Sequence, residues 1–61
     1  LSGREREILR LAESGASISL IASELCLSVG TVRNHVSSAI GKTGAANRTE
    51  AAVTARRRGW L

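Results

Sequence analysis

The chain has no proline, phenylalanine, tyrosine or aspartate, and only one tryptophan and one cysteine among its 61 residues. A single cysteine excludes an internal disulfide and argues against a cysteine-based zinc site. With Trp60 as its sole aromatic residue, the chain lacks the stacking platforms of single-strand binders, which favours a duplex partner. No apolar run approaches the roughly 20 residues of a membrane span, and no signal peptide is visible. We therefore expect a cytoplasmic protein without a membrane segment.

Residues for catalysis are also scarce. His35 and Cys26 are each the only residue of their type, and no glycine-rich phosphate loop is present, so no catalytic pair can be assembled. His35 has no partner at a metal-ligand spacing. We expect no enzymatic activity, no metal and no cofactor. Cys26 is interpreted as a small residue at the edge of a helix packing face.

The charge of the chain is divided unevenly between its two halves. Residues 1–30 hold three arginines and four glutamates, whereas residues 31–61 hold six cations and one glutamate. The overall net charge of +4 therefore comes from a slightly acidic first half and a strongly basic second half. A basic domain of this kind favours a polyanionic partner. Charge alone would equally suit RNA, anionic lipid or simple solubility.

Helical periodicity and capping residues predict two helices in the acidic half. Ser2 and Glu5 form a capping box for the first helix, which ends at Gly15. The second helix begins after Ser17. Its apolar positions follow helical spacing: Ile18, Ile21, Ala22 and Leu25. Ion pairs are expected along the outside of the first helix: Arg4/Glu7, Glu7/Arg10 and Arg10/Glu13.

Two further helices are predicted in the basic half, and no alternating pattern indicates a strand. Ser28 caps a helix over about residues 29–43, so only a tight turn separates it from the second helix. That is the helix-turn-helix arrangement. The last helix begins at Asn47, where Glu50 completes a second capping box, and it ends at Gly59. The expected fold is all-α, a four-helix bundle that contains a helix-turn-helix.

The predicted helix over residues 29–43 has three faces at about 100° per residue. Its buried face is apolar: Val29, Val32, Val36, Ala39 and Ile40. A second face has short, polar or basic side chains: Gly30, Arg33, Asn34, Ser37, Ser38 and Gly41. Thr31, His35 and Lys42 align on a flank between them. This arrangement suits the major groove of duplex DNA, where polar side chains contact base edges and nearby donors hold phosphates.

Three residues of the polar face are the predicted base readers. Arg33 would bond guanine O6 and N7, and Asn34 would bond adenine N6 and N7. Ser37 is short and would act through water. Lys42 and Arg48 are predicted to contact the phosphate backbone. For all five residues, a merely solvated side chain is the alternative interpretation.

The chain resembles LuxR/GerE-type DNA-binding domains, and in particular the C-terminal effector domains of NarL/FixJ-class bacterial response regulators. The residues that carry the resemblance cover the whole chain without gaps: Leu1-Ser2, Arg4 to Leu9, Gly15, Ser17, Ile21-Ala22, Leu25, Leu27-Ser28, Thr31 to Val36, Ile40, Lys42, Gly44, Asn47 to Ala51 and Gly59 to Leu61. The resemblance implies a transcription regulator whose third helix reads the major groove. It also implies phosphate contacts beside the recognition helix: Ser28, Thr31, His35 and Lys42.

The resemblance further implies a homodimer on paired DNA half-sites. The dimer contact would lie on the small-residue face of the last helix: Ala51, Ala52 and Ala55. Trp60 is interpreted as a core or dimer contact. Residues 1–61 would be one domain, and because the chain begins at Leu1 rather than Met, we expect it to be the C-terminal part of a longer regulator. A receiver or sensor domain would precede it.

The chain departs from the family pattern at three places. Gly3 replaces the usual proline, Thr43 replaces a leucine, and Ile18-Ser19-Leu20 replaces Asn-Lys-Glu. The last change removes a lysine that could touch a phosphate and leaves Leu20 as an exposed contact. The rival hypothesis is a helical protein-interaction module that uses Leu20 and the small-residue face of the last helix. Binding that persists through high salt would favour this rival.

Overall fold

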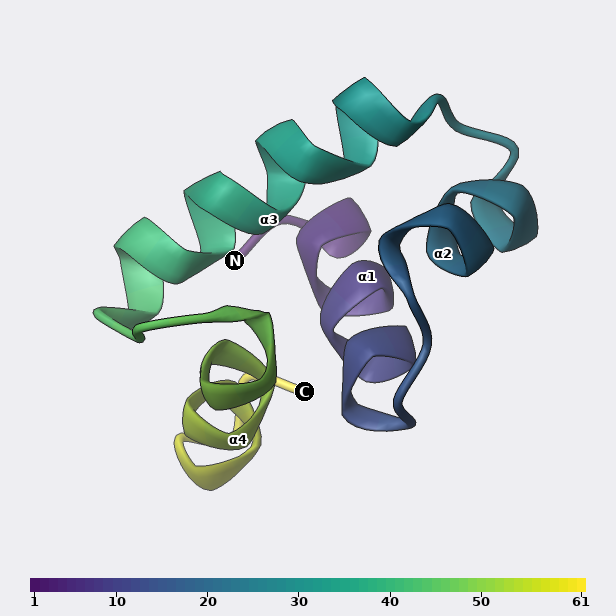
Figure 1. Cartoon of the computed structure of the whole chain (residues 1–61). Helices are drawn as coiled ribbons and strands as arrows, with labels where there is room; N and C mark the ends of the chain where they lie inside the picture. Colours follow the sequence, from purple (N-terminus) through teal and green to yellow (C-terminus); the bar gives the residue numbers. More distant parts are fainter.

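The protein consists of four helices joined by short connections, and a computed structural model describes all residues from 1 to 61 (Figure 1). The helices are α1 (Gly3–Glu13), α2 (Ile18–Leu25), α3 (Val29–Thr43) and α4 (Arg48–Arg57). α1 and α3 each contact all the other helices, whereas α2 and α4 do not contact one another. None of the four is long and apolar enough to cross a membrane. The predicted all-α fold and the extent of the third helix are confirmed.

Each helix begins at a side chain that accepts a backbone N–H from the first turn. At α1 the Ser2 hydroxyl accepts from the Glu5 N–H at 3.1 Å, and the Glu5 carboxylate accepts from the Ser2 N–H at 2.7 Å. Ser17 caps α2 in the same way at 3.1 Å. The Asn47 side chain caps α4 at 2.9 Å, but Glu50 returns no bond to Asn47, so the second predicted capping box is only half formed.

The turn between α2 and α3 begins at Cys26, the one non-glycine residue in the left-handed backbone region, with φ of 56°. Its N–H bonds to the carbonyls of Ala22 and Ser23, which ends α2. Its side chain is exposed. The interpretation of Cys26 as a small residue at the edge of a helix packing face is therefore wrong, because Cys26 follows the last turn of α2 in the left-handed conformation and is exposed.

The core contains two clusters that meet along α1 and α3. The aliphatic cluster joins α1, α2 and α3: Ile8, Ala12, Ala16, Ile21, Ala22, Val32 and Val36. The alanine cluster joins α1, α3 and α4: Leu9, Ala39, Ala51, Ala52 and Ala55. Ile40 contacts both clusters. Since the neighbours Ile8 and Leu9 belong to different clusters, α1 separates the two halves of the molecule.

The ion pairs of α1 differ from those expected along its surface. Of the three predicted pairs only Arg4–Glu7 forms, with 3.7 Å between nitrogen and oxygen. Glu13 instead accepts two hydrogen bonds from the Arg56 guanidinium, at 3.0 and 2.7 Å. The end of α4 packs close to the end of α1, so Glu13 bonds to Arg56 rather than to Arg10. This exposed pair ties α1 to α4.

Candidate nucleic-acid interface

α3 presents one side to solvent because the other three helices lie against its opposite side (Figure 1). The exposed side carries the residues predicted for it: Gly30, Arg33, Asn34, Ser37, Ser38 and Gly41. The buried side consists of Val32, Val36, Ala39 and Thr43. Val29 was expected there but is 39% exposed, because it is the first residue of α3 and follows directly on the α2–α3 turn. We call the exposed side the open face of α3.

Two glycines leave the backbone of α3 uncovered by side chains on the open face. A Cβ added at Gly41 would meet no atom within 4 Å, and one added at Gly30 would meet only the Ser28 hydroxyl, at 4.0 Å. Neither glycine is needed for space within the domain. Each costs the helix roughly 0.5 to 1 kcal/mol relative to alanine. This cost favours a use that requires close approach to the backbone of α3.

The predicted base readers are unengaged in the free domain. Arg33, Asn34 and Ser37 are exposed, and none of their side chains has a hydrogen-bond or ion-pair partner in the domain. His35, on the flank of α3, and Arg48, at the start of α4, are half-buried and also lack such a partner. All five residues keep their donors available to a ligand.

The start of α3 holds a pair of linked hydroxyl groups. The Ser28 hydroxyl accepts from the Thr31 N–H at 3.1 Å and donates to the Thr31 hydroxyl at 2.9 Å. The hydroxyl hydrogen of Ser28 is therefore engaged, whereas that of Thr31 remains available. The positive end of the helix dipole also favours an anion at this position. Of the two residues, Thr31 offers a hydroxyl donor without rearrangement.

Lys42 is engaged within the domain, which the sequence did not indicate. Its Nζ donates to the Glu5 carboxylate at 2.9 Å; the Glu5 side chain is 3% exposed and that of Lys42 is 51% exposed. The Ser2 N–H, the Ser38 hydroxyl and Lys42 together lower the pKa of Glu5 to about 2, against the opposing effect of burial. The carboxylate is therefore ionised at neutral pH and holds Lys42 beside the open face.

Glu5 was predicted only as part of a capping box, and Ser38 only as a member of the polar face. The bond between Lys42 and Glu5 joins the second half of α3 to α1, across 37 residues of sequence. No periodic pattern reports a contact of that length. The opposite charges of Glu5 and Lys42 were the only feature of the sequence that could have indicated this ion pair. Many other pairs of acidic and basic residues in the chain have the same feature.

The three alanines predicted as a dimer contact are part of the core. Ala51, Ala52 and Ala55 are each 0% exposed in the alanine cluster. They cannot touch a partner, so the dimer contact predicted for these residues is wrong. Their small side chains instead let α4 approach α1 and α3 closely. The outward side of α4 carries Val53, which is 46% exposed.

The rival interaction module loses its small-residue face by the same burial. Leu20, its other predicted contact, is 50% exposed and stands alone at the start of α2. Trp60 is half-buried against the alanine cluster, and the Arg58 guanidinium lies 5.0 Å from its ring centroid. Trp60 thus packs on the core, in agreement with one of the two predicted roles.

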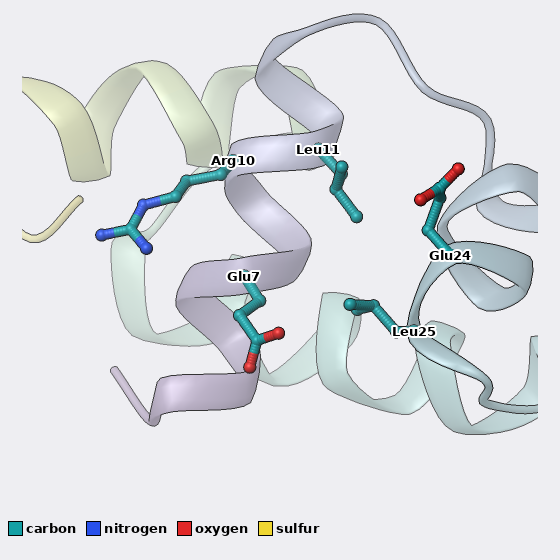
Figure 2. Close-up of a pocket in the computed structure, with 5 residues that line it drawn as sticks. All are labelled: Glu7, Arg10, Leu11, Glu24 and Leu25. Atoms are coloured by element: carbon teal, nitrogen blue, oxygen red, sulfur yellow. The ribbon is translucent and has the colours of Figure 1, made fainter.

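One surface hollow, of about 270 Å³, lies between α1 and α2. Its lining is Glu7, Arg10, Leu11, Glu24 and Leu25 (Figure 2). Leu11 and Leu25 point toward one another across it, while Arg10 extends to the other side of α1 (Figure 2). The hollow is open and its polar groups do not converge on one point. No three His, Cys, Asp or Glu side chains gather as a metal site.

Comparison with known proteins identifies clear relatives of this arrangement. The family model for bacterial regulatory proteins of the luxR family matches residues 1–55. The transcriptional regulatory protein YvfU of Bacillus subtilis is 54% identical over the whole chain, which covers 30% of that protein. The response regulator RamR of Streptomyces coelicolor is 47% identical over 98% of the chain, which again covers 30% of it.

A relative of nearly the same length gives a more complete match. The spore germination protein GerE of Bacillus subtilis is 44% identical over the whole chain, which covers 82% of that protein. The solved structure of the transcription factor GerE superposes with a TM-score of 0.88 and 42% identity, over 97% of this chain and 88% of that one. The chain therefore matches most of one relative and less than a third of the two longer ones.

Proposed function

This chain belongs to the luxR family of bacterial regulatory proteins, and we propose that it binds duplex DNA sequence-specifically with α3 in the major groove. The family comprises transcription regulators and not enzymes, so the domain acts by positioning rather than by chemistry. The open face of α3 is the observation that carries the proposal. It combines unpartnered donors with two glycines, and it is the only side of α3 that the core leaves free.

We assign two kinds of contact to the residues around this face. Contacts with base edges are assigned to Arg33, Asn34 and Ser37. Their side chains are exposed on the open face of α3 and have no hydrogen-bond partner within the domain. The phosphate contacts flank them: Ser28, Thr31, His35, Lys42 and Arg48. Phosphate contacts fix the register of the domain on DNA, whereas base contacts determine the preferred sequence.

We propose that the full protein is a homodimer on paired half-sites, with a receiver or sensor domain before residue 1. Its likeness to RamR, which is named a response regulator, supports the second part. A small domain gains affinity from pairing, since the second half-site is reached at high effective concentration. The outward side of α4, with Val53, is left to provide the contact between protomers.

The first test is binding to DNA of random sequence. A labelled duplex of about 30 base pairs is titrated with the domain between about 50 and 300 mM salt and followed by fluorescence anisotropy. We expect micromolar binding whose affinity falls steeply with salt. Trp60 emission in the same samples reports that the domain is folded. A folded domain that does not bind at the lowest salt would overturn the proposal.

Two substitutions separate the assigned roles once a target has been selected from a random library. Arg33→Ala should relax the preference at one base position, by about 1 to 3 kcal/mol of discrimination. Lys42→Ala should weaken all sequences about equally and reduce the salt slope by about 1. Arg57→Ala, which removes an exposed cation from α4, is the control for charge alone. Equal losses of specificity from the first two variants would contradict the assignment.

A further inference from the structure

A buried carboxylate of α1 is bonded to the one lysine at the edge of the open face. Glu5 is 2% exposed, and its oxygen lies 2.9 Å from the Lys42 ammonium. We propose that Glu5 is a positioning residue for DNA binding, which holds the Lys42 ammonium in one place so that it can contact a single phosphate. The inference rests on the proposed DNA-binding function.

The position of Glu5 is itself fixed. The oxygen that bonds Lys42 also accepts the Ser2 N–H at 2.7 Å, so the carboxylate is held by the capping box of α1. Lysine has a flexible side chain, whose rotamer freedom is ordinarily lost when it contacts a phosphate. Holding Lys42 against a rigid carboxylate removes that freedom before DNA arrives. Less entropy is then lost on binding.

The bond to Glu5 leaves Lys42 able to bind an anion. An ammonium group has three donors, and one of them is directed at the Glu5 carboxylate. Half of the Lys42 side chain is exposed, so the remaining donors are open to solvent. A phosphate oxygen can therefore be bound on the outer side of Lys42 while the inner bond persists.

Two alternative roles for the Glu5–Lys42 pair predict different behaviour. If only charge mattered, Glu5 would hinder binding, because its negative charge cancels that of Lys42 at long range. Alternatively, Lys42 could serve only as the counter-charge of a buried carboxylate. Removal of the Glu5 charge would then change the stability of the domain, and its effect on DNA affinity would not depend on Lys42. A second ion pair of α1 serves as the comparison: Glu13–Arg56, at 2.7 Å, is exposed, joins α1 to α4 and involves no residue of α3.

Glu5→Gln and Glu13→Gln are the two variants to compare. Each raises the net charge by one and removes the charge from one partner of an ion pair. Glutamine also serves in a capping box, so Glu5→Gln keeps the bond to Ser2. We expect Glu13→Gln to bind the random-sequence duplex as tightly as the unmodified domain or slightly more tightly. Glu5→Gln should bind about fivefold more weakly, as expected for a disturbed charge-assisted contact.

The same comparison in a Lys42→Met background tests whether Glu5 acts through Lys42. In that background Glu5→Gln should no longer weaken binding, and its effect on Kd should be the same as that of Glu13→Gln. The proposal is overturned if Glu5→Gln tightens binding as Glu13→Gln does, or if its loss of affinity is the same with Met at position 42. Trp60 emission confirms folding of each variant. An unmodified domain that fails to bind at all refutes the proposed function itself, a separately recognisable result.

Nuclear magnetic resonance tests the inference without any substitution. The ¹⁵N-labelled ammonium of Lys42 should give a persistent signal in the free domain, because its bond to Glu5 slows exchange with water. This signal should shift but persist when the random-sequence duplex is added, since the proposal retains the inner bond. Loss of the contact to Glu5 in the complex would refute it.

Discussion

The two halves of the molecule are held to α1 by different means. On the side of α2, large aliphatic side chains fill much of the space between the helices. On the side of α4, alanines allow close approach of the backbones, and the ion pair between Glu13 and Arg56 is exposed. α2 and α4 do not touch, so each half depends on α1 and α3 alone.

The two kinds of packing should stabilise the helices to different extents. Burial of large aliphatic groups removes more apolar surface from water than burial of alanine methyls, and apolar burial stabilises in proportion to area. The half that orients α3 should therefore be the more stable one, and α4 the helix that separates first. Four substitutions or changes of condition test this comparison, from the largest expected effect to the smallest.

Removal of a large side chain from the aliphatic cluster should have the greatest effect. Ile21 is 0% exposed, and Ile21→Ala should destabilise the domain by about 2 to 5 kcal/mol. A chain of this size has only a few kcal/mol of stability in total, so much of the variant should be unfolded at room temperature. Circular dichroism during urea titration measures this. Leu20→Ala, at the exposed neighbouring position, is the control and should change little.

Acid should weaken the attachment of α1 to the second half of α3, which includes the bond between Glu5 and Lys42. Its pKa of about 2 in the folded domain lies below the ordinary value of 4.5. Ionised Glu5 therefore stabilises the fold above about pH 4.5, and this contribution is lost as the pH falls toward 2. The loss amounts to at most about 3 kcal/mol. Thermal unfolding as a function of pH measures it, and Glu5→Gln should flatten the profile. An unchanged profile would contradict the role of the carboxylate.

Overfilling the alanine cluster should loosen α4 selectively. Ala52 is 0% exposed, and Ala52→Val adds two methyl groups where helices approach closely, at a cost of about 1 to 3 kcal/mol. Hydrogen exchange should show that amides of α4 lose protection before those of α3. Val53→Ala, at the exposed neighbouring position, is the control. Equal loss of protection in both helices would mean that the two halves unfold as one unit.

The smallest effect is expected from the exposed pair between α1 and α4. Arg56 lowers the pKa of Glu13, but both side chains are accessible to solvent, so water and salt screen their attraction. Glu13→Gln should shift the unfolding midpoint slightly at low salt and not at high salt. A large, salt-independent shift would indicate that this pair holds α4 as firmly as the alanine cluster does.

The helices were predictable because their signals are local. The residue that caps each helix accepts a hydrogen bond from the N–H three residues further along the chain, so the signal for a helix start lies within four residues of sequence. The caps are Ser2, Ser17, Ser28 and Asn47. The open face of α3 was equally predictable, since one helical period sorts its residues into exposed and buried sides. The assignment of particular bases and phosphates to these residues stays a prediction.

The packing partners were not predictable from local pattern. A small-residue side on a helix is typical both of close packing within a domain and of contacts between protomers, so Ala51, Ala52 and Ala55 were misassigned. Thr43, which replaces a leucine of the family pattern, is 6% exposed, and its hydroxyl bonds the Ala39 carbonyl at 2.9 Å. The burial of the three alanines and of Thr43 depends on which helices pack against them, and the local sequence does not report that.

Cys26 and Trp60 provide two natural positions for spectroscopic probes, one in each half of the molecule. Cys26 ends α2 in one half, and Trp60 packs on the alanine cluster of the other. Each is the only residue of its type, so a thiol-reactive acceptor on Cys26 and the indole of Trp60 form an energy-transfer pair without any substitution. The transfer efficiency then follows the separation of the two halves as acid, urea or DNA is added.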